Sequence, residues 1–247
     1  MIAYGENIQV FCGNSNPQFA QTICKELGVP MGKAIVTHFA DGEASVTLEE
    51  TVRGADVFLI QSTCKPVNDS LMELLIMVDA CRRANVEYLR RAGDMAGKYG
   101  LRIAVENMLS NRRMDGSVYW RYCTHAEELV DLVDAIDMEN VQICLDVGHA
   151  HYMGENLYNT IKLYGKRLIA LHIHDNNRMD DLHLLPFHGT LKWDDVLLGL
   201  RAVDYAGDFT FEIQNATRRA PEELYPQLCR TAFEIGQYLL RRYNALA

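Results

Sequence analysis

The last two thirds of the chain alternate between helix-forming and strand-forming segments. An amphipathic segment at residues 86–99 precedes the apolar run LRIAVEN, and the same order recurs with VQICLDVGH, RLIALHIHD and DFTFEIQ. Strands that alternate with helices of this length form parallel βαβ units. The alternation therefore predicts an α/β fold with four parallel strands in this part of the chain, followed by a long helix that begins at Pro221.

Each of the four strand segments ends in a side chain that binds divalent metal ions: Glu106, Asp146, His172 and Glu212. In a (βα)8 barrel, catalytic and metal-binding residues come from the C-terminal ends of successive strands. Two glutamates, one aspartate and one histidine make a donor set suited to Mn²⁺, Mg²⁺, Co²⁺ or Zn²⁺. A single strand-end carboxylate could merely cap the next helix, but four in consecutive strands favour one shared metal site.

The histidines are concentrated in the same part of the sequence. Six of the eight lie within residues 149–188: His149, His151, His172, His174, His183 and His188. His172 and His174 are two residues apart in a strand, so their side chains share one face. A hydrogen-bonded pair at a buried strand edge is the alternative interpretation. We expect His172 to be a metal ligand and His174 to be its neighbour in the same pocket.

Residues 1–85 have a different organisation and predict a separate small α/β unit. The strand segment IQVFC leads into a helix whose first position is Pro17. Two strand-like runs flank Asp41-Gly42, a strong hairpin signal, and the buried strand ADVFLIQST precedes an amphipathic helix. We therefore predict two domains, residues 1–85 and residues 86–247.

Charge and composition exclude several classes of protein. The net charge of −9 opposes nucleic-acid binding, which needs a basic surface to replace counterions. No apolar run reaches the roughly 18 residues that a membrane span needs, and no signal peptide is recognisable. The seven cysteines form no CxxC pair, which argues against a zinc knuckle or a disulfide framework. We expect a cytoplasmic protein with reduced cysteines.

The motifs of residues 86–247, namely EN, DxGH, HIHDNNR, DxH and FEI, resemble the xylose-isomerase-like barrel superfamily of sugar isomerases and epimerases, which also contains endonuclease IV. The resemblance covers one helix and then strands five to eight of such a barrel. It implies that the four strand-end residues hold one divalent metal and that Glu106 and Glu212 also act as acid and base. It further implies that His149 and Arg178 bind substrate, with His183 contacting substrate or lying beside the metal ligands.

Proton abstraction next to a carbonyl explains these residue types independently. The reaction needs a metal to polarise the carbonyl oxygen and a carboxylate on each face of the carbon. We therefore expect a sugar or sugar-phosphate isomerase or epimerase that acts on a small-molecule sugar through an enediolate. The endonuclease interpretation is weaker, because its additional early histidines are not recognisable and the acidic charge opposes a phosphate backbone.

Residues 8–84 resemble the N-terminus of ribose-phosphate pyrophosphokinase through FCGNSNPQFAQTICKELGVPMGKA, FADGE, VRGADVFLIQST and PVNDSLMELLIMVDACRRA. The resemblance implies that Phe39, Asp41 and Glu43 lie on a hairpin that contacts ATP across a subunit interface. It stops at Asn85, before the remaining ATP-binding residues, the ribose-5-phosphate loop and the diphosphate loop. Because phosphoryl transfer requires both substrates to be positioned, we do not expect pyrophosphokinase activity.

The expected fold is therefore chimera-like: an N-terminal phosphoribosyltransferase-like α/β fragment joined to a half (βα)8 TIM barrel. A half-barrel alone leaves two open sheet edges. The N-terminal strands could pair onto it, two chains could form a homo-oligomer through their half-barrels, or the product could be poorly folded. The alternatives to a metal-dependent enzyme are a non-catalytic nucleotide-binding or oligomerising fragment and a fused product with no assembled site.

Overall fold

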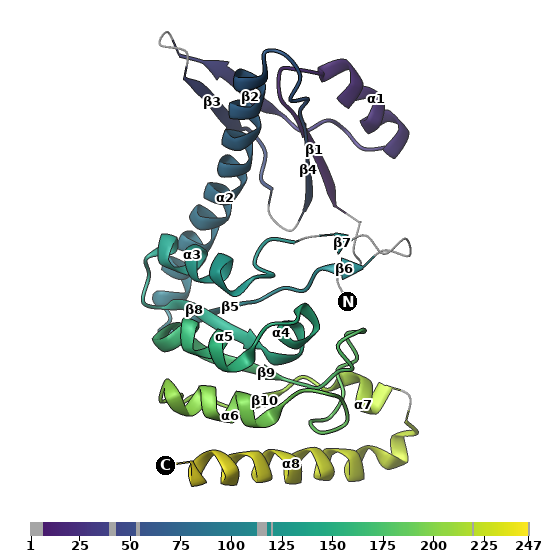
Figure 1. The fold of residues 1–247 in the computed structure, drawn as a ribbon, viewed down its shortest axis with the longest axis vertical. Coiled ribbons are helices and arrows are strands. Elements are labelled where there is room, and N and C mark those ends of the chain that lie inside the picture. Colours follow the sequence, from purple (N-terminus) through teal and green to yellow (C-terminus); the bar gives the residue numbers. More distant parts are fainter. Residues whose placement is uncertain are drawn as a thin grey trace. The chain divides into compact units, whose positions relative to one another are not determined.

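The computed structural model of the protein describes residues 7–39, 43–52, 55–112, 118–119, 121–218 and 220–246. The chain divides into two compact units, Met1–Arg91 and Ala92–Ala247. Helix α2 (Val67–Gly97) contains this division and also the domain boundary that we predicted between residues 85 and 86 (Figure 1).

The N-terminal unit combines a parallel strand pair with a hairpin. Its elements are β1 (Ile8–Cys12), α1 (Pro17–Leu27), β2 (Ala34–His38), β3 (Ala44–Leu48), β4 (Asp56–Ile60) and the first part of α2. Strands β1 and β4 pair in parallel, whereas β2 and β3 pair antiparallel. Phe11, Val46 and Met77 are buried in a core shared by the strands and α2. The hairpin signal Asp41-Gly42 lies outside the described residues.

Helix α2 spans the predicted domain boundary. We expected helical segments before residue 85 and over residues 86–99, with the seam inside what could be one continuous helix, and α2 runs through both segments as 31 helical residues. The sequence has neither Gly nor Pro between Pro66 and Gly93, so nothing in the backbone favours a break. A change in sequence resemblance within a helix therefore does not require a change in backbone conformation.

The C-terminal unit contains the predicted parallel strands. Strands β5 (Ile103–Glu106), β8 (Val141–Asp146), β9 (Leu168–Ile173) and β10 (Thr210–Phe211) form one sheet in the order β10-β9-β8-β5, with every pair parallel. In this register Asp146 lies beside His172 and His172 beside Thr210. The parallel arrangement brings the C-terminal ends of all four strands to the same edge.

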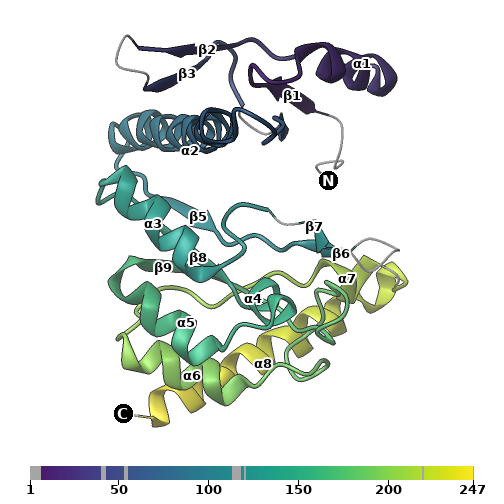
Figure 2. The same ribbon diagram turned by 45° about the horizontal axis from the view of Figure 1, so that its top comes forward.

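Helices cover this sheet in chain order. They are α3 (Ala126–Ile136), α4 (Val147–Met153), α5 (Leu157–Tyr164), α6 (Trp193–Ala202), α7 (Gln214–Arg218) and α8 (Tyr225–Ala245), with short 3₁₀ turns at Gly165–Arg167 and Glu222–Leu224. Helices α3, α5, α6 and α8 lie side by side in that order (Figures 1 and 2). Apolar side chains such as Leu129, Ile143 and Leu171 are fully buried in this unit. The core therefore holds the strand ends in place.

Three local features differ from the sequence-based expectation. Helix α3 begins after His125, whose backbone N–H donates to Glu128 Oε2 at 3.4 Å. The capping box therefore lies one residue later than the Thr124-x-x-Glu127 motif of the sequence predicts. The closing helix begins at Tyr225, after a 3₁₀ turn that follows Pro221. A short hairpin of β6 (Asn111–Arg112) and β7 (Val118–Tyr119) was not predicted.

None of the helices within the described ranges is both long and apolar enough to cross a membrane.

Candidate metal centre

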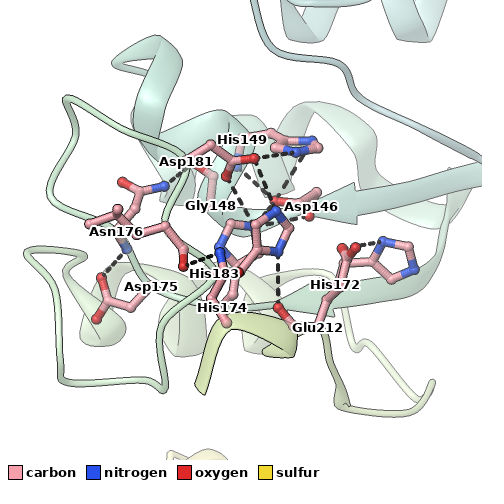
Figure 3. A network of polar contacts seen from close by, with 12 residues as sticks. Asp146, Gly148, His149, His172, His174, Asp175, Asn176, Asp181, His183 and Glu212 are labelled. Carbon is pink, nitrogen blue, oxygen red and sulfur yellow. Dashed lines mark hydrogen bonds and ion pairs between the residues drawn. The ribbon is translucent and has the colours of Figure 1, made fainter. Parts of the chain in front are cut away.

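The four predicted strand-end ligands gather at the C-terminal edge of the parallel sheet. Glu106, Asp146, His172 and Glu212 each offer one ligand atom, and these atoms all lie within 4.8 Å of one another. We call this group the strand-end set. Glu106 and Asp146 end β5 and β8, while Glu212 follows β10 and its backbone N–H donates to the Ile173 carbonyl at 3.0 Å. Figure 3 shows Asp146, His172 and Glu212 near one another at this edge.

Asp146 has two roles at its strand end. Its Oδ1 accepts the backbone N–H of His149 at 2.7 Å and so caps helix α4. The same fully buried carboxylate belongs to the strand-end set. Asn107 holds the Asp146 backbone from β5, because its amide accepts from the Asp146 N–H at 2.7 Å and donates to the Asp146 carbonyl at 3.0 Å. Helix capping and membership of the set are therefore compatible.

The imidazole of His172 lies between the two glutamates. Its Nδ1 is 3.3 Å from Glu106 Oε2 and 3.2 Å from Glu212 Oε2. Contacts with Cys144 and Glu106 raise the pKa of His172 to about 11. Burial and the negative charge of Asp146 raise the pKa of Glu212. This concentration of acidic groups around one imidazole gives the site a strong attraction for a cation.

Two atoms of the strand-end set lack a hydrogen bond. Among the described residues, Nδ1 of His172 and Oε2 of Glu212 are buried and face each other at 3.2 Å as an ion pair, without hydrogen-bond geometry. Buried polar atoms are normally paired, and a cation would satisfy both of these. Three carboxylates and one imidazole also match the oxygen and nitrogen donors that Mg²⁺, Mn²⁺, Co²⁺ and Zn²⁺ accept. The residues present therefore fit a divalent ion.

A second cluster lies beside the strand-end set and consists of His149, His174, Asp181 and His183, with one ligand-type atom of each within 4.8 Å of the others. Asp181 Oδ2 is 3.0 Å from His183 Nε2 and 3.7 Å from His149 Nε2. Nδ1 of His183 also lies 3.0 Å from the Glu212 carbonyl. The two groups are thus physically connected through Glu212.

Opposite charges within the second cluster stabilise the ionised forms of His149 and Asp181. Burial alone would lower the pKa of His149, but the hydrogen bond with Asp181 and the charge of Asp146 raise it to about 9. Although burial acts in the opposite direction, hydrogen bonds with His149 and His183 hold the pKa of Asp181 well below its usual range. His149 is therefore cationic and Asp181 anionic near neutral pH.

Two of the three predicted substrate-binding residues lie in the second cluster, and the third lies outside both groups. His149 and His183 both lie in the second cluster, and His149 Nδ1 is 3.4 Å from Glu106 Oε1. Arg178 lies outside both groups, where its exposed guanidinium donates to the Gly154 carbonyl at 3.2 Å. Of these three residues, only His149 and His183 belong to a cluster of ligand-type side chains.

The predicted ATP-contacting residues belong to the N-terminal unit. Phe39 is exposed at the end of β2, and its backbone N–H donates to the Glu43 carbonyl at 2.8 Å. Asp41 lies outside the described residues. The hairpin that would carry these three positions is formed by β2 and β3.

Several residues of the site were not identified from the sequence. Asn107, Asp175 and Asn176 are buried, polar and hydrogen-bonded around the strand ends. Asn176 Nδ2 donates to the Gly148 carbonyl at 2.8 Å, which ties the end of β9 to helix α4. These residues follow an apolar strand directly in the sequence. Polar residues at that position can be buried beside the strand ends, and this was the signal that could have identified them.

The fold and the site agree with a match to a known family. The family described as xylose isomerase-like TIM barrel matches residues 66–233, and the chain belongs to this family. The N-terminal domain of ribose phosphate pyrophosphokinase matches residues 8–90. Both predicted resemblances are thereby confirmed. The two matched regions overlap within residues 66–90, almost entirely in helix α2.

Curated relatives are similar to the N-terminal part. A ribose-phosphate pyrophosphokinase of Clostridium perfringens is 58% identical over 82 residues, which are 33% of this chain and 26% of the relative. The enzyme of Gloeobacter violaceus is 40% identical over 138 residues, 56% of this chain and 40% of the relative. The matched region spans about a quarter of the length of the first of these relatives.

Solved structures of sugar epimerases share the fold. A D-tagatose 3-epimerase-like protein has a TM-score of 0.54 at 22% identity, covering 78% of this chain and 80% of that one. D-psicose 3-epimerase of Clostridium cellulolyticum H10 has a TM-score of 0.54 at 20% identity, covering 66% and 57%. The 3-keto-D-glucoside 4-epimerase of E. coli has a TM-score of 0.51 at 17% identity, covering 89% and 84%. The neighbours place the α/β fold among TIM barrels of this type.

Proposed function

We propose that the protein is a divalent-metal-dependent sugar or sugar-phosphate isomerase or epimerase that acts through an enediolate. The observation that carries this proposal is the convergence of two glutamates, an aspartate and a histidine at the ends of four parallel strands. Membership of the xylose isomerase-like family and the sugar epimerases among its structural neighbours support it.

In this proposal the strand-end set holds one divalent ion, either Mn²⁺, Mg²⁺, Co²⁺ or Zn²⁺. When bound, such an ion polarises the substrate carbonyl and stabilises negative charge on the enediolate. Asp146 is the buried anchor of the set, since its side chain is fully enclosed while those of Glu106, His172 and Glu212 are each about one third exposed. The three partly exposed side chains border the space that a sugar would enter.

Glu106 and Glu212 carry out the proton transfers. They belong to β5 and to the end of β10, which are the two outer strands of the sheet, and they approach His172 from two sides. One carboxylate removes the proton from the carbon next to the carbonyl, and the other returns a proton on the opposite face. The raised pKa of Glu212 brings it closer to neutral pH, where general acid–base catalysis is most effective.

Substrate contacts come from the second cluster and the loop beside it. His149 and His183 offer imidazole donors next to Glu106 and Glu212 and would bind sugar hydroxyls. Arg178 is the third proposed contact, and it would exchange its bond to the Gly154 carbonyl for one to the substrate. A phosphorylated sugar would gain most from such an exchange, because a guanidinium pairs well with phosphate.

We also infer that β5, β8, β9 and β10 correspond to strands five to eight of a (βα)8 barrel, and that the chain joins parts of two families. The four parallel neighbours in chain order and the two overlapping family matches support this inference. The division of the chain inside α2 is consistent with a join in that helix.

Elemental mass spectrometry of the purified protein tests the metal centre. After incubation with Mn²⁺ or Co²⁺ and removal of free metal, we expect about one ion per chain in the wild type and none in the Glu106→Gln/Asp146→Asn double variant. The Glu139→Gln/Asp180→Asn variant is a matched control, since both carboxylates are exposed. A wild-type protein that binds no metal would overturn the proposal.

If the wild type binds metal, the metal-loaded protein is assayed with ketohexoses, including D-fructose and D-tagatose, and with their phosphates.

A second candidate function rests on the N-terminal unit. Its 58% identity over 82 residues to a ribose-phosphate pyrophosphokinase favours a non-catalytic nucleotide-binding or oligomerising role. Phe39 is exposed on its hairpin and would contact the nucleotide. Calorimetric titration of the full chain with ATP tests this role: binding that is lost in Phe39→Ala would favour it, and absence of binding would remove it.

A further inference from the structure

His174 makes a contact that the proposed chemistry does not use. Its Nε2 lies 2.9 Å from Oδ1 and 3.1 Å from Oδ2 of Asp146, so one ring nitrogen faces both carboxylate oxygens. Both side chains have zero solvent exposure. His174 follows β9 directly, and Asp146 ends the neighbouring strand β8. The contact therefore joins two strand ends beside the other residues of the strand-end set (Figure 3).

The space for the His174 ring depends on Gly148. A Cβ atom added at Gly148 would overlap the imidazole, with Cε1 as the nearest atom. Gly148 lies within helix α4, where alanine is normally the better residue by roughly 1 kcal/mol. On its opposite face the His174 ring stacks on His183, with ring centroids 4.0 Å apart and planes 17° apart. The ring is thus confined between a glycine and another imidazole.

The Asp146 carboxylate is held by two donors. The backbone N–H of His149 reaches Oδ1 from helix α4, and His174 approaches from β9. Hydrogen bonds to an ionised group are strong, and in a buried environment they define its orientation. Without His174, a buried carboxylate would lose one of these donors and could turn away from Glu106 and His172. Substitution of a residue that orients a metal ligand in this way commonly lowers the metal affinity.

We propose that His174 is a positioning residue that orients Asp146 for metal binding, and that Gly148 is required because it leaves room for the His174 ring. The proposal rests on the metal centre of the proposed function. His174 itself donates to Asp146 and does not enter the strand-end set. This positioning role requires one N–H donor at the place of the His174 Nε2 atom.

Metal titration of three variants tests this requirement. Removing the donor while keeping an aromatic ring, in His174→Phe, should weaken Mn²⁺ or Co²⁺ binding by about 10- to 100-fold. His174→Gln, whose amide nitrogen can occupy the position of Nε2, should restore most of the affinity. His188→Phe is the matched control, because His188 is exposed on the same loop. The visible absorption spectrum of bound Co²⁺ should change in His174→Phe and return towards the wild type in His174→Gln.

Gly148→Ala tests the same contact without altering His174. The added methyl group should displace the ring and weaken metal binding by a similar factor, about 10-fold or more. Gly236→Ala is the control, since Gly236 is also helical and a Cβ there would meet its nearest atom, in Phe211, at an ordinary 3.6 Å. This pair provides the decisive comparison if His174→Phe does not fold, as judged by circular dichroism.

The outcomes separate the two proposals. If the wild type binds no metal, the proposed metal centre fails and the role of His174 fails with it. If the wild type binds metal and both His174→Phe and Gly148→Ala bind it equally well with an unchanged Co²⁺ spectrum, only the positioning role is overturned. Weakened binding that His174→Gln does not restore would also contradict it, because the loss would then not depend on the donor.

Discussion

The indole N–H of Trp193 donates a hydrogen bond of 3.2 Å to Oδ2 of Asp175. The Asp175 carboxylate also accepts three backbone N–H groups, from Asn176, Phe187 and Leu191. Because Asp175 is fully buried, these four donors offset the cost of removing its charge from water. They also close the loop of residues 176–191, which carries Asp181 and His183 to the second cluster.

Asp175→Asn should destabilise the protein. The amide would present hydrogen atoms to donors, which would leave buried N–H groups unpaired, and the expected loss in the free energy of unfolding is about 2–4 kcal/mol. Urea denaturation measures it. Asp180→Asn is the control, because Asp180 is exposed in the same loop and should change stability by less than about 0.5 kcal/mol. Equal stability of the two variants would show that the carboxylate does not hold the loop.

Metal binding should stabilise the folded chain. A ligand that binds only the folded state at about 100 times its Kd adds about 2.7 kcal/mol to the free energy of unfolding. Differential scanning calorimetry with Mn²⁺ should therefore show a higher Tm, which a chelator reverses. The Asp146→Asn variant should show no increase. An equal increase in that variant would place the stabilising ion elsewhere on the chain.

The stability of the metal-free protein should fall as the pH rises from neutral. His149 has a pKa of about 9 in the folded protein against 6.5 for the free side chain. Since the folded state binds this proton more tightly, the stabilisation is complete below about pH 6.5 and is lost as the pH approaches 9. The difference in pKa corresponds to about 3 kcal/mol.

Urea denaturation in the presence of a chelator, at about pH 6 and about pH 9.5, measures this effect. His149→Gln should reduce the difference in the free energy of unfolding between the two pH values. His151→Gln should leave this difference unchanged, because burial lowers the pKa of His151. Identical pH dependence in the wild type and His149→Gln would contradict the prediction.

Glu212→Gln should abolish turnover and weaken metal binding. The amide cannot exchange a proton with the substrate carbon, and general acid–base catalysis typically contributes about 10²–10⁴-fold to the rate. Proton exchange between substrate and D₂O, followed by NMR on the sugar that the wild type converts, measures the transfer directly. Glu139→Gln should behave as the wild type. Turnover that survives in Glu212→Gln, assayed at saturating metal, would show that another group moves the proton.

The parallel strands and the ligand-type residues at their ends were predictable from the sequence. Each of the strand-forming runs that became β5, β8, β9 and β10 is preceded by a helix-forming segment, so local patterning indicates both the elements and the ligand-type residue near the end of each strand. Because parallel strands present their C-terminal ends at one edge, the convergence of Glu106 and Asp146 with His172 and Glu212 also followed. The helical segments on either side of Asn85 were also predictable, and in the structure they form the single helix α2.

Only the tertiary structure determined what surrounds the strand-end set. The contact between His174 and Asp146 joins residues 28 positions apart and depends on the register of β8 and β9. The room that Gly148 leaves for the His174 ring, and the position of Asp181 beside His183, depend on how a helix and a loop pack over the strand ends. Local propensity carries no information about such contacts, because their energies arise from burial and hydrogen bonding between segments that are distant in the chain. The sequence by itself therefore determined which ligand-type residues stand at the strand ends, and the packing of the chain decided which neighbours hold and orient them.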